Sequence, residues 1–440
     1  MKYILRTASL ALALGAVVSG CDVLDVKPTA SVPDTEALNS PRKAELVISG
    51  AYNQLQGFQD TAVIFNELNS DNARHTGSFP TWLEIDTYNY TSANVDIQAQ
   101  WGPAYNLINI CNFIIADVPA IETSLAFSPV RRREIVSEAR VLRAFAYHHL
   151  VRYFGDVPLV TEPTREVNEE SYPARTPAAD VYTQIVTDLR TAEDSLGTVN
   201  KVSGFIDVWT AKALLARVYL YQARYADAEA KASEVLAGPF ALAPLATLYE
   251  GGGGTETIFT LTYSSTDTNG LSFFAYPNGG GGRFEYAPTP SILAAFTAAD
   301  ARRPFNIRRV GTTDVVGKYF RITTDDDPHY IVRLAEMLLT RAEARARTGN
   351  NAGALTDLNA IRTRAALPGI AATVTGTALV DAVIDERRLE LAFEGHRWHD
   401  LVRTGKAVAT LSLPSPERQL WPIPQRDRNV NPNLTQNAGY

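Results

Sequence analysis

The chain contains few cysteines, and their scarcity excludes a disulfide framework. Only two of its 440 residues are cysteine. Cys21 lies near the N-terminus, and Cys111 lies in the apolar helical stretch WGPAYNLINICNFIIADV, where we expect a small, buried hydrophobic side chain. The stability of the fold must therefore come from the packing of its core.

Long apolar runs and blocks of positive charge are also missing. No stretch of about 18 apolar residues follows the N-terminal region, so we expect no transmembrane helix. The formal net charge is −7, and there is no basic cluster beyond short arginine runs, which excludes the usual signature of a nucleic-acid partner. With 45% hydrophobic residues, the composition is typical of a soluble globular protein with a substantial core.

The first 21 residues have the features of a bacterial secretory signal. Lys2 and Arg6 provide a basic start, an apolar stretch covers residues 8–18, and small residues precede Cys21. The ending VSGC resembles a lipobox, in which cleavage leaves the cysteine as the new N-terminus and its thiol carries a lipid. Such an anchor would hold an otherwise soluble domain at a membrane. An ordinary secreted protein that is cleaved nearby is the alternative.

Helical periodicity dominates the rest of the chain, and the predicted helices come in pairs. In the clearest pair, small alanines and large aromatic side chains alternate across a tight turn, as in a tetratricopeptide repeat of about 34 residues. Any antiparallel helical hairpin would give a similar pattern. The four expected pairs are 207–222 with 225–237, 329–347 with 351–365, 41–57 with 101–116, and 130–153 with 178–194.

Two segments interrupt the helical pattern. Residues 58–100 lack helical periodicity, and residues 250–290 combine two glycine runs with short β-like stretches such as TIFTLTY. Neither glycine run is followed by the lysine that a phosphate-binding loop requires, so we interpret both as loop tips. Long irregular segments inside a compact domain are commonly functional or disordered.

The stretch DERRLELAFEGHRWHDLVRTG concentrates acids and histidines near the C-terminus. Glu386, Glu390 and Glu394 are spaced four residues apart, on one helical face, and nearby arginines can pair with them. A zinc-protease helix needs the pattern His-Glu-x-x-His, whereas His396 and His399 are three residues apart and no glutamate follows the first. We expect a structural network of charges and no metal site.

The ordered motifs together resemble one known family. After the lipobox come EARVLRAFAYHHLVRYFGDVPLV, AKALLARVYLYQARYADA, RLAEMLLTRAEA, LNAIRTRA, the DERRLELAFEGHRWHDL stretch and the ending LWPIPQRDRNVNPNLTQNAGY. This series resembles the SusD/RagB family of outer-membrane nutrient-binding lipoproteins. The resemblance covers nearly the whole mature chain, and residues 58–100 and 240–300 are the parts that match no family pattern.

The resemblance implies a mainly α-helical fold. Its scaffold would be a tetratricopeptide-like repeat of about four helix pairs, with an irregular, loop-rich, ligand-facing part and a few short β-strands. It implies a signal peptide at 1–20, a lipidated tether at 21–40 and one SusD-like domain at 41–440. Within that domain, the N-terminal SusD-like part covers about 41–240 and the C-terminal SusD/RagB part about 285–440.

The resemblance also implies a function. Such proteins sit on the cell surface, anchored in the outer membrane, over a TonB-dependent transporter of the SusC type. They capture oligosaccharides or other nutrients and help to deliver them to the channel, and they are not enzymes. We expect the same of this chain, with no cofactor and no nucleic-acid partner.

A sugar-binding site needs an exposed aromatic platform and planar polar groups. Four of the five tryptophans lie in stretches that we assign to the scaffold, and only Trp82 lies in an irregular segment. We therefore predict a ligand site around Trp82, built from both irregular segments, with loop packing as the alternative for each residue. The other predicted members are Asp71, Asn72, Arg74, Phe274, Tyr276, Asn278 and Arg283.

Two other functions stay open at this point. A lipid-anchored hydrolase would use acids such as Asp71 and Glu84 as a general acid and base, as glycosidases do. A helical-repeat adaptor would bind protein on its concave surface and take no small ligand. The ligand is open as well, because the scarcity of loop tryptophans leaves a peptide or another small nutrient beside a glycan.

Overall fold

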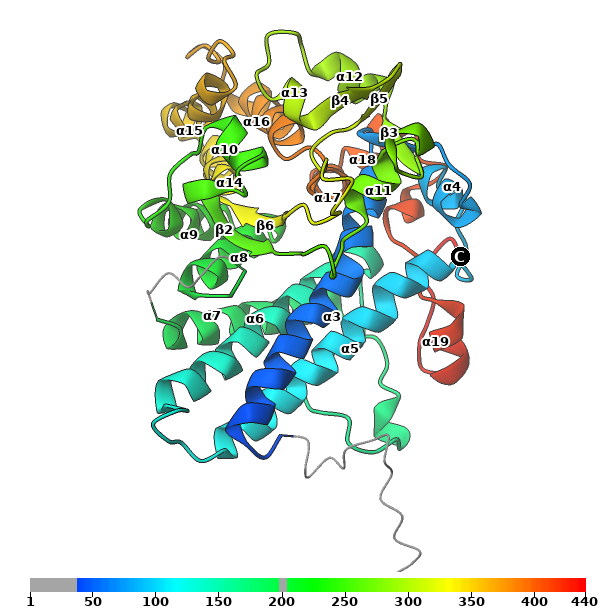
Figure 1. Cartoon of the computed structure of the whole chain (residues 1–440), viewed down its shortest axis with the longest axis vertical. Coiled ribbons are helices and arrows are strands. Elements are labelled where there is room, and N and C mark those ends of the chain that lie inside the picture. Colours follow the sequence, from blue (N-terminus) through cyan, green and yellow to red (C-terminus); the bar gives the residue numbers. More distant parts are fainter. Residues whose placement is uncertain (1–37, 198–203) are drawn as a thin grey trace, which may run out of the picture.

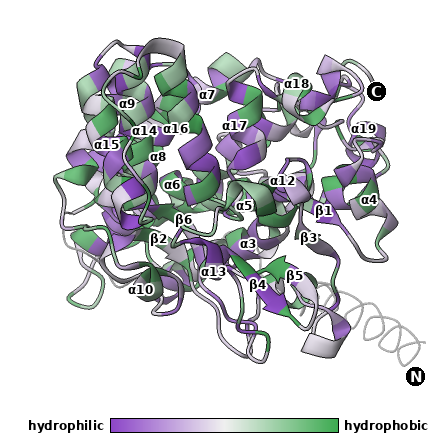
Figure 2. Cartoon of the chain, turned by 90° about the horizontal axis from the view of Figure 1, so that it is seen from above, coloured by the Kyte–Doolittle hydropathy of each residue, from purple (hydrophilic) through white to green (hydrophobic). Residues whose placement is uncertain are grey.

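The computed structural model describes residues 38–197 and 204–440 (Figure 1). The predicted signal peptide at 1–20, the lipidation site Cys21 and most of the tether lie outside the described residues. Seen from above, helices α8, α9, α14, α15 and α16 gather on one side of the molecule, and strands β1, β3, β4 and β5 lie on the other (Figure 2). The predicted mainly helical fold with a few short strands is confirmed.

All four expected helix pairs pack against each other. The pairs are α3 (Pro41–Leu68) with α5 (Val95–Asp117), α6 (Pro129–Phe154) with α7 (Ala178–Ser195), α8 (Val208–Tyr221) with α9 (Tyr225–Leu236), and α14 (Leu334–Arg347) with α15 (Asn351–Arg364). One boundary was wrong. Residues 329–333 form strand β6 (His329–Arg333), and the helix begins only at Leu334.

Helix α3 is longer than its sequence pattern predicts. It begins at Pro41, where proline at the first position needs no hydrogen-bond partner for its nitrogen. It then continues to Leu68, so the prediction that residues 58–68 are irregular was wrong. Nearly every residue from Phe58 to Leu68 is buried, and a helix that is covered on all sides has no polar face to reveal its period.

The second half of helix α6 is also covered on all sides. Residues 141–151 are all buried, including the polar Arg143, His148 and His149. The helix ends at Gly155, whose φ of +72° suits glycine. Cys111 on the neighbouring helix α5 is buried and unpaired, as expected.

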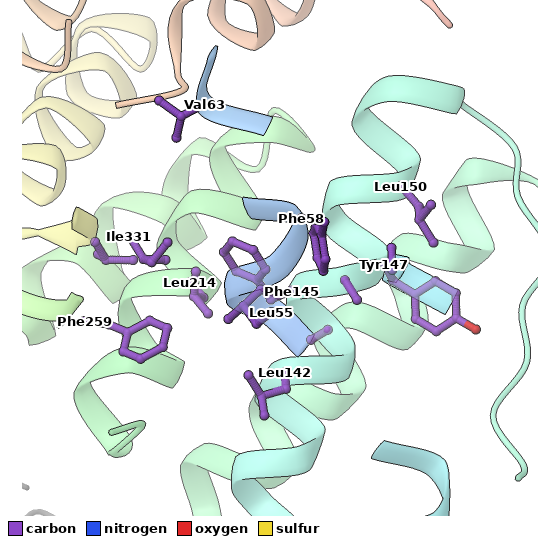
Figure 3. Close-up of a cluster of buried hydrophobic side chains, with 14 of the residues drawn as sticks. Leu55, Phe58, Val63, Leu142, Phe145, Tyr147, Leu150, Leu214, Phe259 and Ile331 are labelled. Atoms are coloured by element: carbon purple, nitrogen blue, oxygen red, sulfur yellow. The ribbon is translucent and has the colours of Figure 1, made fainter. Parts of the chain in front are cut away.

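The main core forms where α3, α6 and α8 meet two strands. Figure 3 shows Leu55 and Phe58 of α3 among side chains of α6, with Leu214 of α8 nearby. Phe259 and Ile331 approach the same cluster from β2 (Thr257–Leu261) and β6, which pair antiparallel. The predicted β-like character of TIFTLTY is confirmed by β2.

Two further antiparallel pairs and several short helices complete the described part. Strand β1 (Ala73–His75) pairs with β3 (Tyr286–Pro288), and β4 (Ile307–Val310) with β5 (Thr313–Val316). Among the described helices, none has the length and apolar character that crossing a bilayer requires. The other helices are α4 (Pro80–Asp86), α10 (Leu245–Tyr249), α11 (Leu271–Ala275), α12 (Pro290–Ala295), α13 (Arg303–Asn306), α16 (Gly376–Glu390), α17 (Arg397–Arg403), α18 (Ala407–Leu411) and α19 (Gln425–Val430).

Candidate ligand-binding site

The two segments from which we predicted a ligand site lie side by side. In the β1–β3 pair, Arg74 stands opposite Ala287. Beyond the strands the contact continues, because Thr76 donates a backbone hydrogen bond to the carbonyl of Glu285 (3.0 Å) and a hydroxyl hydrogen bond to that of Phe284 (2.8 Å). Segments about 200 residues apart in sequence therefore form one surface, between α4 and α11 (Figure 1).

A cleft of about 620 Å³ opens between these segments. One wall is formed by residues 76–78 and the other by residues 273–285, and the predicted residues Asn278 and Arg283 line it. We call this hollow the 76/283 cleft. Its volume falls within the range of about 300–1,000 Å³ that is usual for small-molecule sites. The remaining lining residues are Thr76, Gly77, Ser78, Phe273, Pro277, Gly282, Phe284 and Glu285.

Glu285 fixes the shape of the 76/283 cleft. Its buried carboxylate accepts hydrogen bonds from the backbone N–H groups of Ser78 (2.8 Å) and Phe79 (3.2 Å) and from Nε of Arg283 (2.7 Å). Burial by itself raises the pKa of this carboxyl, but the Arg283 guanidinium and the N–H donors outweigh burial and leave the pKa below its usual range. The carboxylate is therefore charged and fully occupied, and it joins the two walls.

Arg283 is held in place and still reaches solvent. Its guanidinium carbon lies 4.1 Å from the centroid of the Phe79 ring, and its side chain is 44% exposed. A guanidinium that is fixed by both a carboxylate and an aromatic face loses little further entropy on binding. Asn278, on the same wall, is exposed. The cleft thus presents one planar cation and one amide to a ligand.

Backbone hydrogen bonds fix the wall that carries Asn278 and Arg283. Phe284 has a φ of +58°, which is uncommon for a residue with a Cβ. Two backbone hydrogen bonds of 2.7 Å hold it there, from Arg283 N–H to the carbonyl of Phe273 and from Glu285 N–H to that of Phe274. Backbone held in this region tends to occur at functional sites.

Trp82 does not form the exposed platform that we predicted. It lies on helix α4 and is 4% exposed, so this expectation was wrong. Its ring packs against Phe65, Phe79 and Phe274, with centroid separations of 5.4, 5.2 and 5.1 Å. The contact with Phe274 confirms that the two segments meet. Trp82 therefore supports the cleft from beneath.

Of the two aromatic residues that line the cleft, Phe273 is the exposed one. It is 39% exposed, lines the cleft and lies edge-on to Phe274 with centroids 5.3 Å apart. The sequence analysis missed it, together with Ser78, Phe284 and Glu285. In the run LSFFAY either phenylalanine could face inward, and only the direction of the short helix α11 decides which one is exposed.

Asp71 and Asn72 lie at a different junction. Asp71 pairs with Arg397 at 2.7 Å and with Arg388 at 3.1 Å, and these arginines lower its pKa against the opposing effect of burial. Asn72 is fully buried between Glu67 and Arg388. These predicted site residues thus connect β1 to residues 385–405, the stretch DERRLELAFEGHRWHDLVRTG, which we call the C-terminal signature, and they do not line the cleft.

The other predicted residues are divided between surface and interior. Arg74 is exposed on β1, and Tyr276 is buried, with 8% of its surface exposed. Glu84, the suggested partner of Asp71 in a hydrolase, accepts a hydrogen bond from the Asn94 amide at 2.7 Å. A general acid needs a raised pKa, whereas that of Asp71 is lowered, so this pair does not favour acid–base chemistry.

The C-terminal signature forms the buried charge network that we expected. Arg333, which is 1% exposed, contacts Glu390 (2.6 Å), Glu394 (2.8 Å) and Glu256 (2.8 Å). Arg302 contacts Glu386 at 2.7 Å. The network also includes Asp300, Lys318, Arg362 and Arg364. Its acids and bases are equal in number, so it can be buried without a large excess charge.

The two histidines of the signature belong to the core. His396 and His399 are buried, and burial lowers the pKa of both. His399 packs edge-on against Tyr153, with ring centroids 4.5 Å apart. Across residues 38–197 and 204–440, no group of three or more histidine, cysteine or acidic side chains has a geometry that would hold a metal ion.

Comparison with known proteins gives two family matches. Residues 310–440 match the family model described as "SusD family", and residues 22–220 match the one described as "Starch-binding associating with outer membrane". The chain is also similar to "SusD-like protein P38" of Formosa agariphila, with 27% identity over 100% of this chain and 99% of the relative. A shorter stretch, 25% of this chain and 21% of the relative, is 39% identical to "Starch-binding protein SusD" of Bacteroides thetaiotaomicron.

Solved structures share the fold. A "Laminarin binding SusD-like protein" aligns with a TM-score of 0.81 and 23% identity over 91% of this chain and 100% of that chain. A crystal structure of a "Putative sugar binding protein" from Bacteroides vulgatus aligns with a TM-score of 0.80 and 25% identity over 92% of this chain and 99% of that chain.

Proposed function

Because the chain belongs to the SusD/RagB family, we propose that it is an outer-membrane lipoprotein that binds oligosaccharides. The anchor would be a lipid on Cys21, which would hold the domain at the cell surface. The captured oligosaccharide would then pass to a TonB-dependent transporter of the SusC type. The names of two relatives, one starch-binding and one laminarin-binding, support a glycan as the ligand class.

The observation that carries this proposal is the 76/283 cleft. It combines the exposed ring of Phe273 with the fixed guanidinium of Arg283 and the amide of Asn278. A sugar offers C–H faces that pack on an aromatic ring and hydroxyl groups that pair with planar polar groups. The cleft contains both kinds of partner and no ionised carboxylate that is free to act on a glycosidic bond, because Glu285 is fully hydrogen-bonded.

The test is calorimetric binding of oligosaccharides prepared from laminarin and from starch to the mature chain. Wild type should bind one class saturably and release it unchanged. Phe273→Ala should weaken binding by about tenfold, corresponding to the loss of roughly 1–1.5 kcal/mol of aromatic contact. Arg283→Ala should weaken it by a similar factor, because the charge-assisted hydrogen bonds are lost.

Phe205→Ala is the matched control. Its ring is 49% exposed and packs on Tyr52, with centroids 5.7 Å apart, outside the cleft. Binding that all three variants retain in full would exclude the cleft as the site. Absence of binding by wild type would favour the helical-repeat adaptor, and cleavage of the oligosaccharides would favour the hydrolase.

The anchor and the transporter need separate tests. Wild type expressed in a bacterium of a kind that carries this family should incorporate labelled palmitate and appear in the outer-membrane fraction, and Cys21→Ser should do neither. Affinity purification of the lipidated protein should recover a TonB-dependent transporter. Recovery of the protein as a soluble, unlabelled product would contradict the anchor.

A further inference from the structure

A second recess lies on a different part of the molecule. It has a volume of about 780 Å³ and is bounded by residues 95–112 of α5, by the segment that follows α6 and by α19. Figure 1 shows α19 beside α5. We call it the α5/α19 recess. It shares no lining residue with the 76/283 cleft, and none of the ligand-site residues that we predicted from sequence lines it.

The walls of the α5/α19 recess are fixed by asparagines. Asn112 of α5 donates hydrogen bonds to the carbonyls of Val160 and Glu162, both at 3.0 Å. Asn109, one turn earlier, accepts a hydrogen bond from the backbone N–H of Thr164 at 2.9 Å. Asn431, just after α19, donates to the carbonyl of Pro173 at 2.9 Å and ties the third wall to the second. Hydrogen bonds between its three walls therefore hold the recess in shape.

Several polar groups that line the recess form no side-chain hydrogen bond within the described part of the chain. They are the half-buried Gln98 and Tyr172 and the exposed Asn106 and Arg426. Oδ2 of Asp427 is buried and also has no hydrogen-bond partner. Buried polar atoms normally have one. The recess thus offers unused donors and an unused acceptor together.

The recess also has apolar side chains in its lining. The half-buried ring of Tyr105 lies in its lining and packs on the buried ring of Trp101, with centroids 5.0 Å apart. Val95 and Val430 stand on two of its walls and are 62% and 61% exposed. Large apolar side chains that flank a polar hollow are typical of a binding surface.

These features define the chemistry of the occupant. It must donate and accept hydrogen bonds at closely spaced positions, because amide, hydroxyl, guanidinium and carboxylate groups are all unused. It must also offer apolar C–H surface to the Tyr105 ring and the two valine side chains. Arg426 and Asp427 carry opposite charges on adjacent residues, so the recess has no excess charge to attract an ion. A neutral, polyhydroxylated chain meets all three conditions.

We propose that the α5/α19 recess is a second subsite for a neutral oligosaccharide, separate from the 76/283 cleft. This rests on the proposed function, since it assumes that the protein binds glycans. The second subsite would hold a second oligosaccharide while the 76/283 cleft holds the first.

The test is to fill the recess from an exposed position. Asn106 is exposed on α5, so Asn106→Trp would place a large side chain in the hollow without disturbing the core. Thr187→Trp, on the exposed face of α7, is the matched control. A milder double variant, Gln98→Ala with Asn106→Ala, removes only the two amides. Thermal unfolding of each variant should match that of wild type.

The probes are the oligosaccharides from laminarin and from starch, and the measurements are calorimetric stoichiometry and a crystal structure at saturating sugar. Wild type and Thr187→Trp should bind two equivalents, and Asn106→Trp one. The double alanine variant should weaken the second equivalent by about tenfold, as expected for two lost hydrogen bonds. Electron density for sugar in the recess of wild type would show directly that the second oligosaccharide binds there.

The possible failures differ from one another. One equivalent that Asn106→Trp leaves intact and Arg283→Ala weakens would overturn the second subsite and leave the proposed function standing. One equivalent that Asn106→Trp abolishes would support the recess and exclude the cleft. No binding by wild type would overturn both proposals, and a recess filled by a peptide of a co-purified partner would overturn the sugar assignment.

Discussion

The guanidinium of Arg397 donates two hydrogen bonds to the carboxylate of Asp71, at 2.7 Å and 3.0 Å, across 326 residues of sequence. Both side chains are largely buried. Asp71 lies just before β1, which leads into one wall of the 76/283 cleft. This pair therefore ties the C-terminal signature to the part of the molecule that carries the candidate site.

Asp71→Asn should lower the free energy of unfolding by about 2 kcal/mol, because Arg397 and Arg388 would lose their charged partner in a buried place. Denaturant unfolding at pH 7 measures the change. Asp314→Asn is the control, since its pair with Arg309 is 3.4 Å long and exposed, and such pairs contribute about 0–1 kcal/mol. Equal effects of the two substitutions would contradict the structural role of Asp71.

Arg333→Met should be far more damaging. Removal of this guanidinium leaves Glu256, Glu390 and Glu394 without their shared cation in the interior, and breaking such a pair costs about 3–5 kcal/mol. We expect a large fall in the melting temperature or a chain that does not accumulate in folded form. Arg309→Met, at a position 64% exposed, should change stability by less than about 0.5 kcal/mol. A folded Arg333→Met protein with wild-type stability would contradict the network.

Glu67 should make stability depend on pH in the neutral range. Burial raises the pKa of its carboxyl from 4.5 to about 7 in the folded protein, although Asn72 and Gly395 donate hydrogen bonds to it. The folded state keeps this proton while the unfolded state loses it, so stability falls as pH rises from about 4.5 to about 7.

Glu67→Gln removes this titration. The difference in unfolding free energy between pH 5 and pH 8 should be smaller in the variant than in wild type, with wild type losing relatively more at pH 8. Chemical denaturation at the two pH values measures it, and the comparison cancels any constant cost of the substitution. An identical pH dependence in both proteins would show that Glu67 does not hold a proton at pH 5–7.

Gly282 is a position where any side chain should damage the 76/283 cleft. A Cβ there would lie 2.2 Å from the carbonyl oxygen of Tyr276 and 2.7 Å from that of Phe273, so the backbone would have to shift. Gly282→Ala should therefore destabilise the protein by about 1–3 kcal/mol and weaken binding at the cleft. In Gly279→Ala the new methyl group meets nothing within 4 Å, and both properties should stay unchanged. Full binding by Gly282→Ala would show that the wall tolerates displacement.

The repeat scaffold could be predicted from sequence because its helices have one covered face. The pair α8 and α9 shows this well, with small residues at the contact and a tight turn between the helices. The second half of α3 has no such pattern, since nearly every residue from Phe58 to Leu68 is buried. Periodicity reports the boundary between core and solvent, and it disappears where a helix has no solvent-facing side.

The candidate site was predictable in its location but only partly in its residues. The two irregular segments do meet, and Asn278 and Arg283 do line the cleft. Trp82 was assigned to the surface because it lies outside the repeat pairs, yet helix α4 turns it inward against Phe65. A short helix contains too few residues to reveal its buried face, and the same reason hid the exposed ring of Phe273.

The pairing of β1 with β3 has a consequence for how the protein resists unfolding. Thr76 and Phe284, which bond across the start of the cleft, are 208 residues apart, and closing so long a loop carries an entropic cost that the pairing itself must offset. A sugar that touches both walls would add its binding energy to that closure. A ligand that binds only the folded state raises stability by mass action. Saturation with sugar should therefore raise the free energy of unfolding of the whole chain, and removal of the sugar should reverse the effect.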